Sequence, residues 1–294
     1  MKRQVTGVVN GAIAAASYGT NPLFALPLYS AGIGVNSVLF YRYFIAVVIY
    51  FVWLKLFKRS SLKISKKEFL PLLFLGIIFS LSSLSLFEAF KYIDAGIACT
   101  ILFIYPIIVA IIMAVFFKEK VTKTVVFSIL LTFTGIMLLY KGDSGANLNI
   151  QGLVVVLLSA LFYALYIVGV KNIPSVKHIK TDKLSFYVML FGLLVYIYNL
   201  KFCTQLQILN TPFLWLCTIA LSIFPTIISL ETITISIKLI GSTTTAILGA
   251  IEPLTAIFFG VLLFNEQLTP RIVLGIFLIL TGVILIILRK IIKK

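Results

Sequence analysis

The chain has 294 residues, of which 61% are hydrophobic and only 12% are charged. A soluble domain is about 45 to 50% apolar and about 25% charged, so this composition excludes a soluble globular protein and indicates an integral membrane protein. The formal net charge of +16 would suit a nucleic-acid-binding protein. Its distribution along the chain favours a membrane topology signal instead, so we expect a lipid bilayer and no nucleic acid as partner.

Apolar runs of about 20 residues, the length that crosses the hydrocarbon core as a helix, can be marked ten times. The runs are continuous and do not alternate as barrel strands do, so α-helices are predicted. We therefore expect an all-α membrane protein with ten transmembrane helices. In chain order the predicted spans are Val5–Tyr29, Val38–Phe57, Phe69–Phe90, Ile97–Phe117, Val121–Tyr140, Gly152–Val170, Leu184–Phe202, Phe213–Ile237, Thr243–Phe264 and Ile272–Leu288.

The first predicted span follows two basic residues, and a cleavable signal peptide is its alternative interpretation. Asn10 interrupts the apolar run, and Asn21-Pro22 and Pro27 interrupt the helix further on. Interrupted spans commonly bracket the site of a transporter. Asn10 and Asn21 are therefore candidate substrate ligands, with hydrogen bonding between helices as the alternative role.

The positive charges divide unequally between the two sides of the predicted spans. With the N-terminus in the cytoplasm, 20 of the 25 Lys and Arg residues flank the inner ends of the helices. Cytoplasmic loops carry such an excess, so both termini are predicted to be cytoplasmic. The same flanks would attract anionic lipid headgroups.

A sequence echo recurs at an offset of 147, half of the 294 residues. Two units, 1–147 and 148–294, are predicted, each with five spans. An odd number of spans forces the second copy to enter the membrane from the opposite side, so the copies are inverted. Inverted repeats are typical of secondary transporters, with a substrate site near the midplane between the copies. Without any gap, Lys91, Pro106, Glu119, Thr122, Thr134 and Gly135 recur as Lys238, Pro253, Glu266, Thr269, Thr281 and Gly282.

Several motifs resemble those of the drug/metabolite transporter superfamily, and specifically its EamA-type transporters. They are the stretch from Ala15 to Pro22, the Phe40-Tyr41-Arg42-Tyr43 motif, and the patterns Pro106–Glu119 and Glu252–Glu266. Tyr18 departs from this resemblance, since many relatives carry tryptophan there. The resemblance implies an inner-membrane exporter or exchanger of amino acids, other metabolites or drugs. A minority of relatives carry sugars, nucleotide sugars or lipid-linked sugars, and this alternative stays open.

Two acidic residues inside predicted spans are candidate functional groups. Glu252 lies about ten residues into its span, near the midplane, where an ionised carboxylate is expensive and usually faces a cavity or a partner. Tyr105 is its counterpart in the first copy. Glu252 is predicted to accept a proton or bind an amine; the alternative is a neutral acid bonded to a neighbouring helix. Glu231 lies nearer the cytoplasmic side. It could act as a gate or as a second proton site, and the alternative is a pair with Lys238 at the inner boundary.

Aromatic and basic side chains complete the predicted site. Tyr18, Tyr105, Tyr163 and Tyr166 could line a cavity with hydroxyls and ring faces, or belong to the core and the interfacial belt. Arg42 could bind a substrate carboxylate bidentately. Its alternative role is an anchor to outer headgroups or to Glu88, whose own place on the pathway stays open.

The acids kept in both copies, Glu119 and Glu266, are predicted to be structural. Each precedes a threonine by three residues, and Pro270 stands where a helix would begin. Thr at the N-cap, Pro at the first helical position and a nearby acid are typical of a helix start.

Enzymes and channels are the competing function classes. The single histidine, His178, lies in a Lys-rich loop, and the motifs of metalloproteases and serine hydrolases are missing from the sequence. The three cysteines show no metal or disulfide spacing, so no metal or cofactor is expected. Inverted halves with a lone buried acid favour a carrier over a channel. The carrier is expected to bind a small-molecule substrate, with protons as a candidate coupling ion, and to be a monomer or homodimer.

Overall fold

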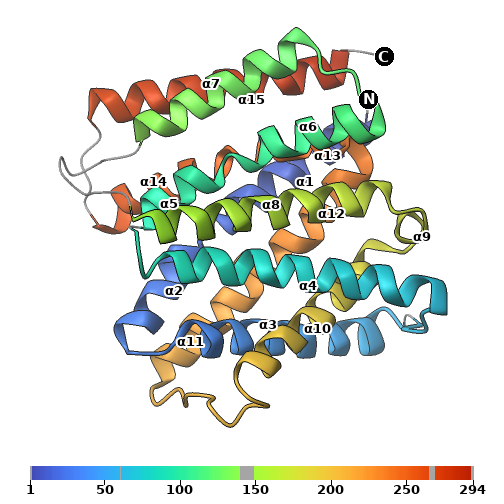
Figure 1. The fold of residues 1–294 in the computed structure, drawn as a ribbon, viewed down its shortest axis with the longest axis vertical. Coiled ribbons are helices and arrows are strands. Elements are labelled where there is room, and N and C mark those ends of the chain that lie inside the picture. The colour runs from blue at the N-terminus through green and yellow to red at the C-terminus, as the bar shows by residue number, and fades with distance from the viewer. Residues whose placement is uncertain (1, 60, 94, 140–148, 265–268, 293–294) are drawn as a thin grey trace.

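A computed structural model describes residues 2–59, 61–93, 95–139, 149–264 and 269–292. All regular structure in these ranges is helical, and they contain no strand. The helices form one bundle, in which the start of α1 and the end of α15 lie at the same end as the short helix α9 (Figure 1). We call this end of the bundle the terminal end.

Each predicted span coincides with one helix or one interrupted helix. The first half contains α1 (Lys2–Tyr18), α2 (Asn21–Ser30), α3 (Val35–Val52), the π-helix η1 (Trp53–Phe57), α4 (Lys66–Ala89), α5 (Ala95–Leu102), α6 (Tyr105–Phe117) and α7 (Lys123–Leu139). The second half contains α8 (Ile150–Asn172), α9 (Pro174–Lys177), α10 (Thr181–Asn199), α11 (Pro212–Ser222), the π-helix η2 (Ile223–Ile228), α12 (Ser229–Ile240), α13 (Ser242–Leu248), α14 (Ile251–Phe264) and α15 (Pro270–Ile292).

Six continuous helical segments in the described ranges are long and apolar enough to cross a membrane. They contain α3, α4, α8, α10, the α11–α12 segment and α15. The other four predicted spans are the shorter α7 and the interrupted pairs α1–α2, α5–α6 and α13–α14. The chain is thus a multi-pass membrane protein, while ten crossings and cytoplasmic termini stay predictions.

The helix starts follow from local sequence. Glu68 of α4 accepts a hydrogen bond from the Ser65 backbone in a capping box, with N···O 2.7 Å. Thr269 accepts from the Ile272 backbone at 3.4 Å, immediately before Pro270 opens α15, as the sequence predicts. The matching cap at Thr122 is not formed, because its buried hydroxyl has no hydrogen-bond partner in the described ranges. Glu266 lies outside the described residues.

Helices α7 and α15 pack along each other (Figure 1) through two reciprocal close contacts. A methyl group added at Gly135 would lie 2.7 Å from the Gly275 carbonyl oxygen. One added at Gly282 would lie 2.9 Å from the Ser128 carbonyl oxygen. Ser128 and Gly275 are 147 residues apart, and so are Gly135 and Gly282. The contact from Gly135 of α7 to Gly275 of α15 is therefore repeated between their counterparts, from Gly282 of α15 to Ser128 of α7. Such an exchange of roles is the pattern of a twofold axis.

A second reciprocal pair joins α1 to α12 and α8 to the turn that follows α4. A methyl group at Gly7 would lie 2.5 Å from the Ile240 side chain, and one at Gly152 would lie 2.8 Å from the Ile93 side chain. Ile93 and Ile240 are again separated by 147 residues. The helix interruptions also fall at corresponding places in the two halves, since α6 starts at Tyr105 and α14 starts at Ile251, next to the Tyr105 counterpart Glu252. The two halves thus make equivalent contacts across an internal pseudo-twofold.

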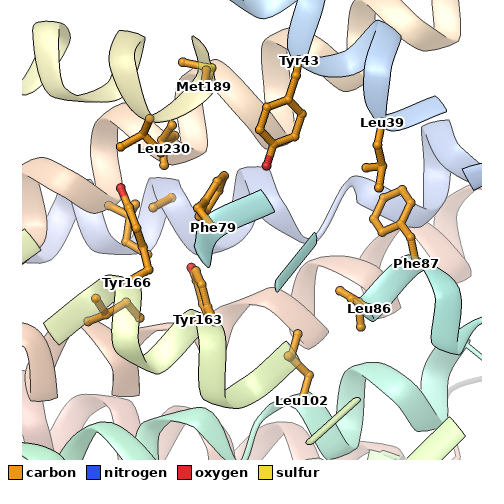
Figure 2. Packing of buried hydrophobic residues seen from close by; sticks show 14 of the residues in the cluster. Leu39, Tyr43, Phe79, Leu86, Phe87, Leu102, Tyr163, Tyr166, Met189 and Leu230 are labelled. Atoms are coloured by element: carbon orange, nitrogen blue, oxygen red, sulfur yellow. The ribbon is translucent and has the colours of Figure 1, made fainter. Parts of the chain in front are cut away.

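An aromatic cluster fills the core beside this axis. Figure 2 shows Phe79 of α4 between Tyr43 of α3 and the two tyrosines of α8, Tyr163 and Tyr166. The Phe79 and Tyr166 ring centroids are 4.8 Å apart. Such pairs stabilise a core beyond their buried area, so these rings fix α8 against α4 next to the interrupted helices.

Candidate functional site

Three helix interruptions converge on one internal cavity. They are the breaks between α1 and α2, between α5 and α6, and between α13 and α14. The cavity has a volume of about 30 Å³ and is lined by residues beside each break. That space holds a water molecule or two and is too small for a metabolite. Four of the predicted site residues line it together: Tyr18, Asn21, Tyr105 and Glu252.

Glu252 lies in the first turn of α14, directly after the interruption. Its backbone N–H donates to the Gly249 carbonyl at 2.9 Å, and Pro253 next to it has no N–H to donate. Gly19 brings α1 so close that a methyl group there would lie 2.5 Å from the Glu252 carbonyl oxygen. The carboxylate itself has neither a hydrogen bond nor an ion pair with any described residue. Whether Glu252 accepts a proton, binds an amine or stays a neutral structural acid therefore remains a prediction.

The tyrosines beside Glu252 form one wall of the cavity. Tyr105 opens α6, and its hydroxyl donates to the Ala246 carbonyl of α13 at 3.1 Å. Tyr163 packs edge-on against Tyr105, with ring centroids 4.8 Å apart, and stacks on Tyr18 at 6.2 Å. Tyr163 is thus a support behind the lining residues, and the bond from Tyr105 ties the two interrupted helices together.

Two predicted ligands lie away from the cavity. The Tyr166 ring is fully buried, and its hydroxyl is 3.3 Å from that of Thr234, in the aromatic core. Asn10 donates its side-chain amide to the Thr6 carbonyl of its own helix at 2.8 Å, more than two turns before the interruption. Their polar groups are satisfied elsewhere, so neither is a cavity ligand in this form.

Arg42 corrects one prediction. Its side chain is 0% exposed, so it anchors to no headgroup. Its guanidinium donates from Nε to the Thr226 hydroxyl and from Nη2 to the Pro225 carbonyl at 3.1 Å, both in η2. Glu88 pairs instead with Lys91 at 2.6 Å. The anchor role is wrong because the arginine is enclosed: η2 accepts its hydrogen bonds, and the rings of Tyr18 and Phe87 lie near its guanidinium.

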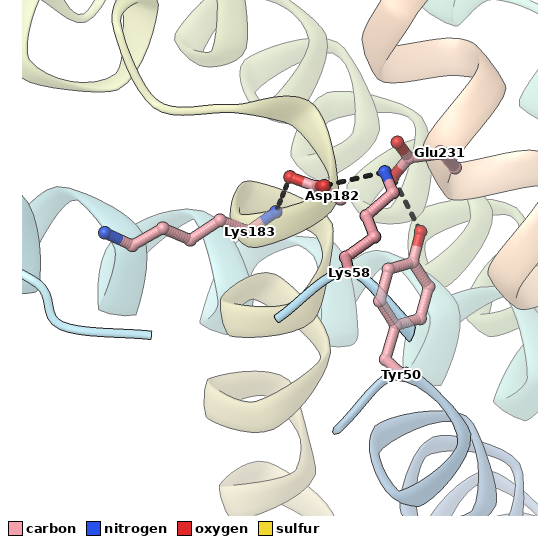
Figure 3. A network of polar contacts seen from close by, with 5 residues as sticks. All are labelled: Tyr50, Lys58, Asp182, Lys183 and Glu231. Carbon is pink, nitrogen blue, oxygen red and sulfur yellow. Dashed lines mark hydrogen bonds and ion pairs between the residues drawn. The ribbon is translucent and has the colours of Figure 1, made fainter. Parts of the chain in front are cut away.

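A polar network joins α3 and η1 to α10 and α12 at the terminal end. The Tyr50 hydroxyl donates to Glu231 Oε2 at 2.6 Å, and Lys58 Nζ lies 2.8 Å from Asp182 Oδ2 (Figure 3). Lys58 also lies over the Trp53 ring, 4.1 Å from its centroid. The predicted pairing of Glu231 with Lys238 is wrong, since Lys238 donates to the Ile179 carbonyl. These contacts tie α3 and the segment after it to α10 and α12.

Comparison with known proteins agrees with this architecture. The sequence profile of the EamA-like transporter family matches residues 5–141 and again residues 150–288. The chain belongs to the EamA-like transporter family. This family is part of the drug/metabolite transporter superfamily, as the sequence motifs indicate.

Individual relatives of this EamA-like transporter carry the same general description. It is 26% identical to an uncharacterized transporter of Archaeoglobus fulgidus over 71% of this chain and 72% of that protein. It is 30% identical to the uncharacterized transporter YxxF of Bacillus subtilis over 39% and 38% of the two chains. One solved crystal structure superposes with a TM-score of 0.81 at 16% identity, covering 99% of both chains, which shows a shared fold.

The sequence of this EamA-like transporter did not point to every cavity residue. Cys99, one of the three cysteines without metal or disulfide spacing, lines the cavity with Leu86, Phe90 and Phe103. Gly249 and the Asn21-Pro22 pair mark two of the interruptions in the sequence. The third falls at Phe103-Ile104, where Pro106, two residues later, is the only signal.

Proposed function

We propose that this EamA-like transporter is a secondary carrier that exports or exchanges a small metabolite, such as an amino acid, a related metabolite or a drug-like compound, across a bacterial inner membrane. The observation that carries this proposal is the cavity with Glu252 at the meeting point of three interrupted helices. Interrupted helices between inverted repeats hold the substrate sites of many secondary transporters, because their free backbone groups can bind a ligand.

Transport requires the cavity to open to each side in turn. The two halves would rock about the internal pseudo-twofold, with the reciprocal glycine contacts as close-packed pivots. Opening the terminal end would separate α3 from α10 and α12. That movement would break the Tyr50–Glu231 hydrogen bond and the Lys58–Asp182 ion pair, and this gives Glu231 its gating role.

Glu252 is proposed to couple a proton to this cycle. A carboxylate that faces an apolar cavity without a fixed partner can exchange a proton when the cavity opens to water. Protonation on one side and release on the other would link the movement of the halves to the proton gradient. The first copy has Tyr105 at the matching position, so only one half carries the coupling group.

The experiment combines a ligand screen with transport in proteoliposomes. Purified protein is first screened by thermal shift against amino acids, sugars, nucleotide sugars and amphipathic cations, because a selective ligand stabilises the folded state. The ligand found is then measured in counterflow and in transport driven by a pH gradient. Saturable counterflow supports a carrier, whereas ohmic current without saturation contradicts it. A sugar or nucleotide sugar that stabilises the protein would instead support the alternative of a sugar carrier.

Glu252→Gln tests the coupling role. We expect it to abolish gradient-driven transport and to spare exchange of substrate in the absence of a gradient. Glu68→Gln is the matched control, because Glu68 caps α4 away from the cavity and glutamine serves equally in a capping box. A Glu252→Gln protein that keeps the pH dependence of the wild type refutes proton coupling at this residue.

A further inference from the structure

Arg42 is a buried cation without a counterion. Its side chain is 0% exposed, and no carboxylate of the described residues lies within ion-pair distance of it. The partners that it has, Thr226 and Pro225, are neutral. An unpaired charge inside a membrane protein is costly, and such residues commonly mark the pathway of a substrate or ion.

The bonds of the guanidinium leave one side of it free. Nε and Nη2 face η2, whereas Nη1 is buried and has no hydrogen-bond partner in the described ranges. The Tyr29 hydroxyl of α2 is likewise buried and unpartnered there. Both groups meet the ring of Phe87: the Arg42 Cζ atom lies 5.7 Å from its centroid, and the Tyr29 ring meets it edge-on at 6.1 Å.

This polar cluster adjoins the central cavity through Tyr18. The Arg42 Cζ atom lies 6.0 Å from the centroid of the Tyr18 ring, and Tyr18 lines the cavity. Asn21 lines the same cavity, and neither atom of its side-chain amide has a partner in the described part of the chain. A shift of the Tyr18 ring would join the cluster to the space beside Glu252.

We propose that Arg42 and Tyr29 bind the carboxylate of the carried solute. This inference rests on the proposed function, since it assigns one end of the transported molecule to a subsite. The two N–H groups of Arg42 Nη1 and the Tyr29 O–H supply three donors, and a carboxylate offers about four lone pairs to accept them. The single positive charge matches one carboxylate. A phosphate, with a charge of about −1.5 to −2, would leave a buried excess of negative charge.

The test measures binding of matched acids and amides to the purified full chain in detergent. Propionate and phenylacetate are titrated against propionamide and phenylacetamide, which have nearly the same shape and no charge. Apparent affinities are read from the shift in melting temperature in chloride-free buffer at constant ionic strength. We expect each acid to bind at least tenfold more tightly than its amide. Equal affinity for acids and amides would overturn the proposal.

Tyr29→Phe is the decisive variant. It removes only a hydroxyl that has no partner in this form, so the ligand-free protein should melt at the same temperature or slightly higher. Binding of the acids should weaken about tenfold, the typical effect of losing one hydrogen bond to a charged group, and binding of the amides should not change. Tyr196→Phe is the matched control, because its hydroxyl donates to the buried Ser80 carbonyl at 3.0 Å. That variant should melt earlier and bind the acids as the wild type does.

Arg42→Gln should abolish the preference for acids over amides, and Arg42→Lys should keep part of it. Arg42 also donates two hydrogen bonds to η2, so Arg42→Gln could fail to fold. In that case the Tyr29→Phe variant alone tests the carboxylate subsite. Unchanged acid binding in Tyr29→Phe, or equal stabilisation by sodium chloride alone, would overturn the carboxylate subsite. Counterflow separates the two proposals: a carrier without acid preference refutes only the subsite, and acid binding without counterflow refutes only carriage.

Discussion

At the residue scale, Gly249 lies against the side chain of Tyr105, one of the residues that line the cavity. A methyl group at Gly249 would lie 1.6 Å from the Tyr105 hydroxyl oxygen and 2.9 Å from its Cζ atom. Gly249→Ala therefore requires the Tyr105 side chain, or α6 with it, to move. We expect it to destabilise the protein by about 1–3 kcal/mol, as overpacking does, in equilibrium unfolding in mixed micelles.

A double-mutant cycle identifies the hydroxyl as the group that clashes. Tyr105→Phe alone should cost about 1 kcal/mol, for the lost bond to the Ala246 carbonyl. Because the phenylalanine ring leaves more room, the double variant should be more stable than the sum of the single effects, by about 1 kcal/mol. Additive losses would show that α13 moves independently of Tyr105.

The sequence predicted part of this site, for physical reasons. Glu252 and Asn21 were predicted because a polar side chain in an apolar span costs free energy unless it has a partner or faces a cavity. Both line the cavity. Tyr166 and Asn10 were predicted by the same reasoning and bond elsewhere, because composition cannot say which face of a helix a side chain occupies. Cys99 carries no charge or bulk that distinguishes it from its apolar neighbours.

At the element scale, the pairing of α7 with α15 depends on Gly135 and Gly282. Added methyl groups would lie 2.7 Å from the Gly275 carbonyl oxygen and 2.7 Å from the Thr132 side chain, respectively. Gly135→Ala and Gly282→Ala should therefore lower the melting temperature by similar amounts, since the two contacts are related by the pseudo-twofold. Close approach at small residues holds membrane helices together, because hydrophobic burial contributes little between them in lipid.

The residues next to these glycines provide the controls. Thr134 is exposed, and the Thr281 hydroxyl donates within its own helix to the Phe277 carbonyl at 2.8 Å. Thr134→Ala and Thr281→Ala should leave the melting temperature within about a degree of the wild type, as surface substitutions usually do. A loss confined to one glycine variant would contradict the equivalence of the two contacts.

Hydrophobic runs predicted where the helices lie but missed some of their irregularities. Within the described residues, each predicted range corresponds to one helix or to one interrupted helix. The π-helical turns η1 and η2 were not foreseen, although Pro225 lies in η2 and removes a backbone donor there. The Trp53–Phe57 turn contains neither proline nor glycine, so its local sequence gives no comparable signal.

At the scale of the whole molecule, α10 provides the most direct test of the inverted arrangement. Its 19 residues span about 29 Å as an α-helix, close to the thickness of the hydrocarbon core. His178 is exposed before its start, among lysines that predict the cytoplasmic side, and Cys203 is half-buried just after its end. With Cys99 and Cys217 replaced by serine, a membrane-impermeant maleimide should label Cys203 in intact cells.

The companion variant carries His178→Cys together with Cys203→Ser and should be labelled only after the cells are permeabilised. The charge distribution requires this result, because the reverse orientation would place 20 of the 25 Lys and Arg residues outside. Labelling of both positions from the same side would mean that α10 does not cross. The second half would then have an even number of spans, and the internal pseudo-twofold could no longer relate the two faces of the membrane. The alternating-access proposal would fail with it.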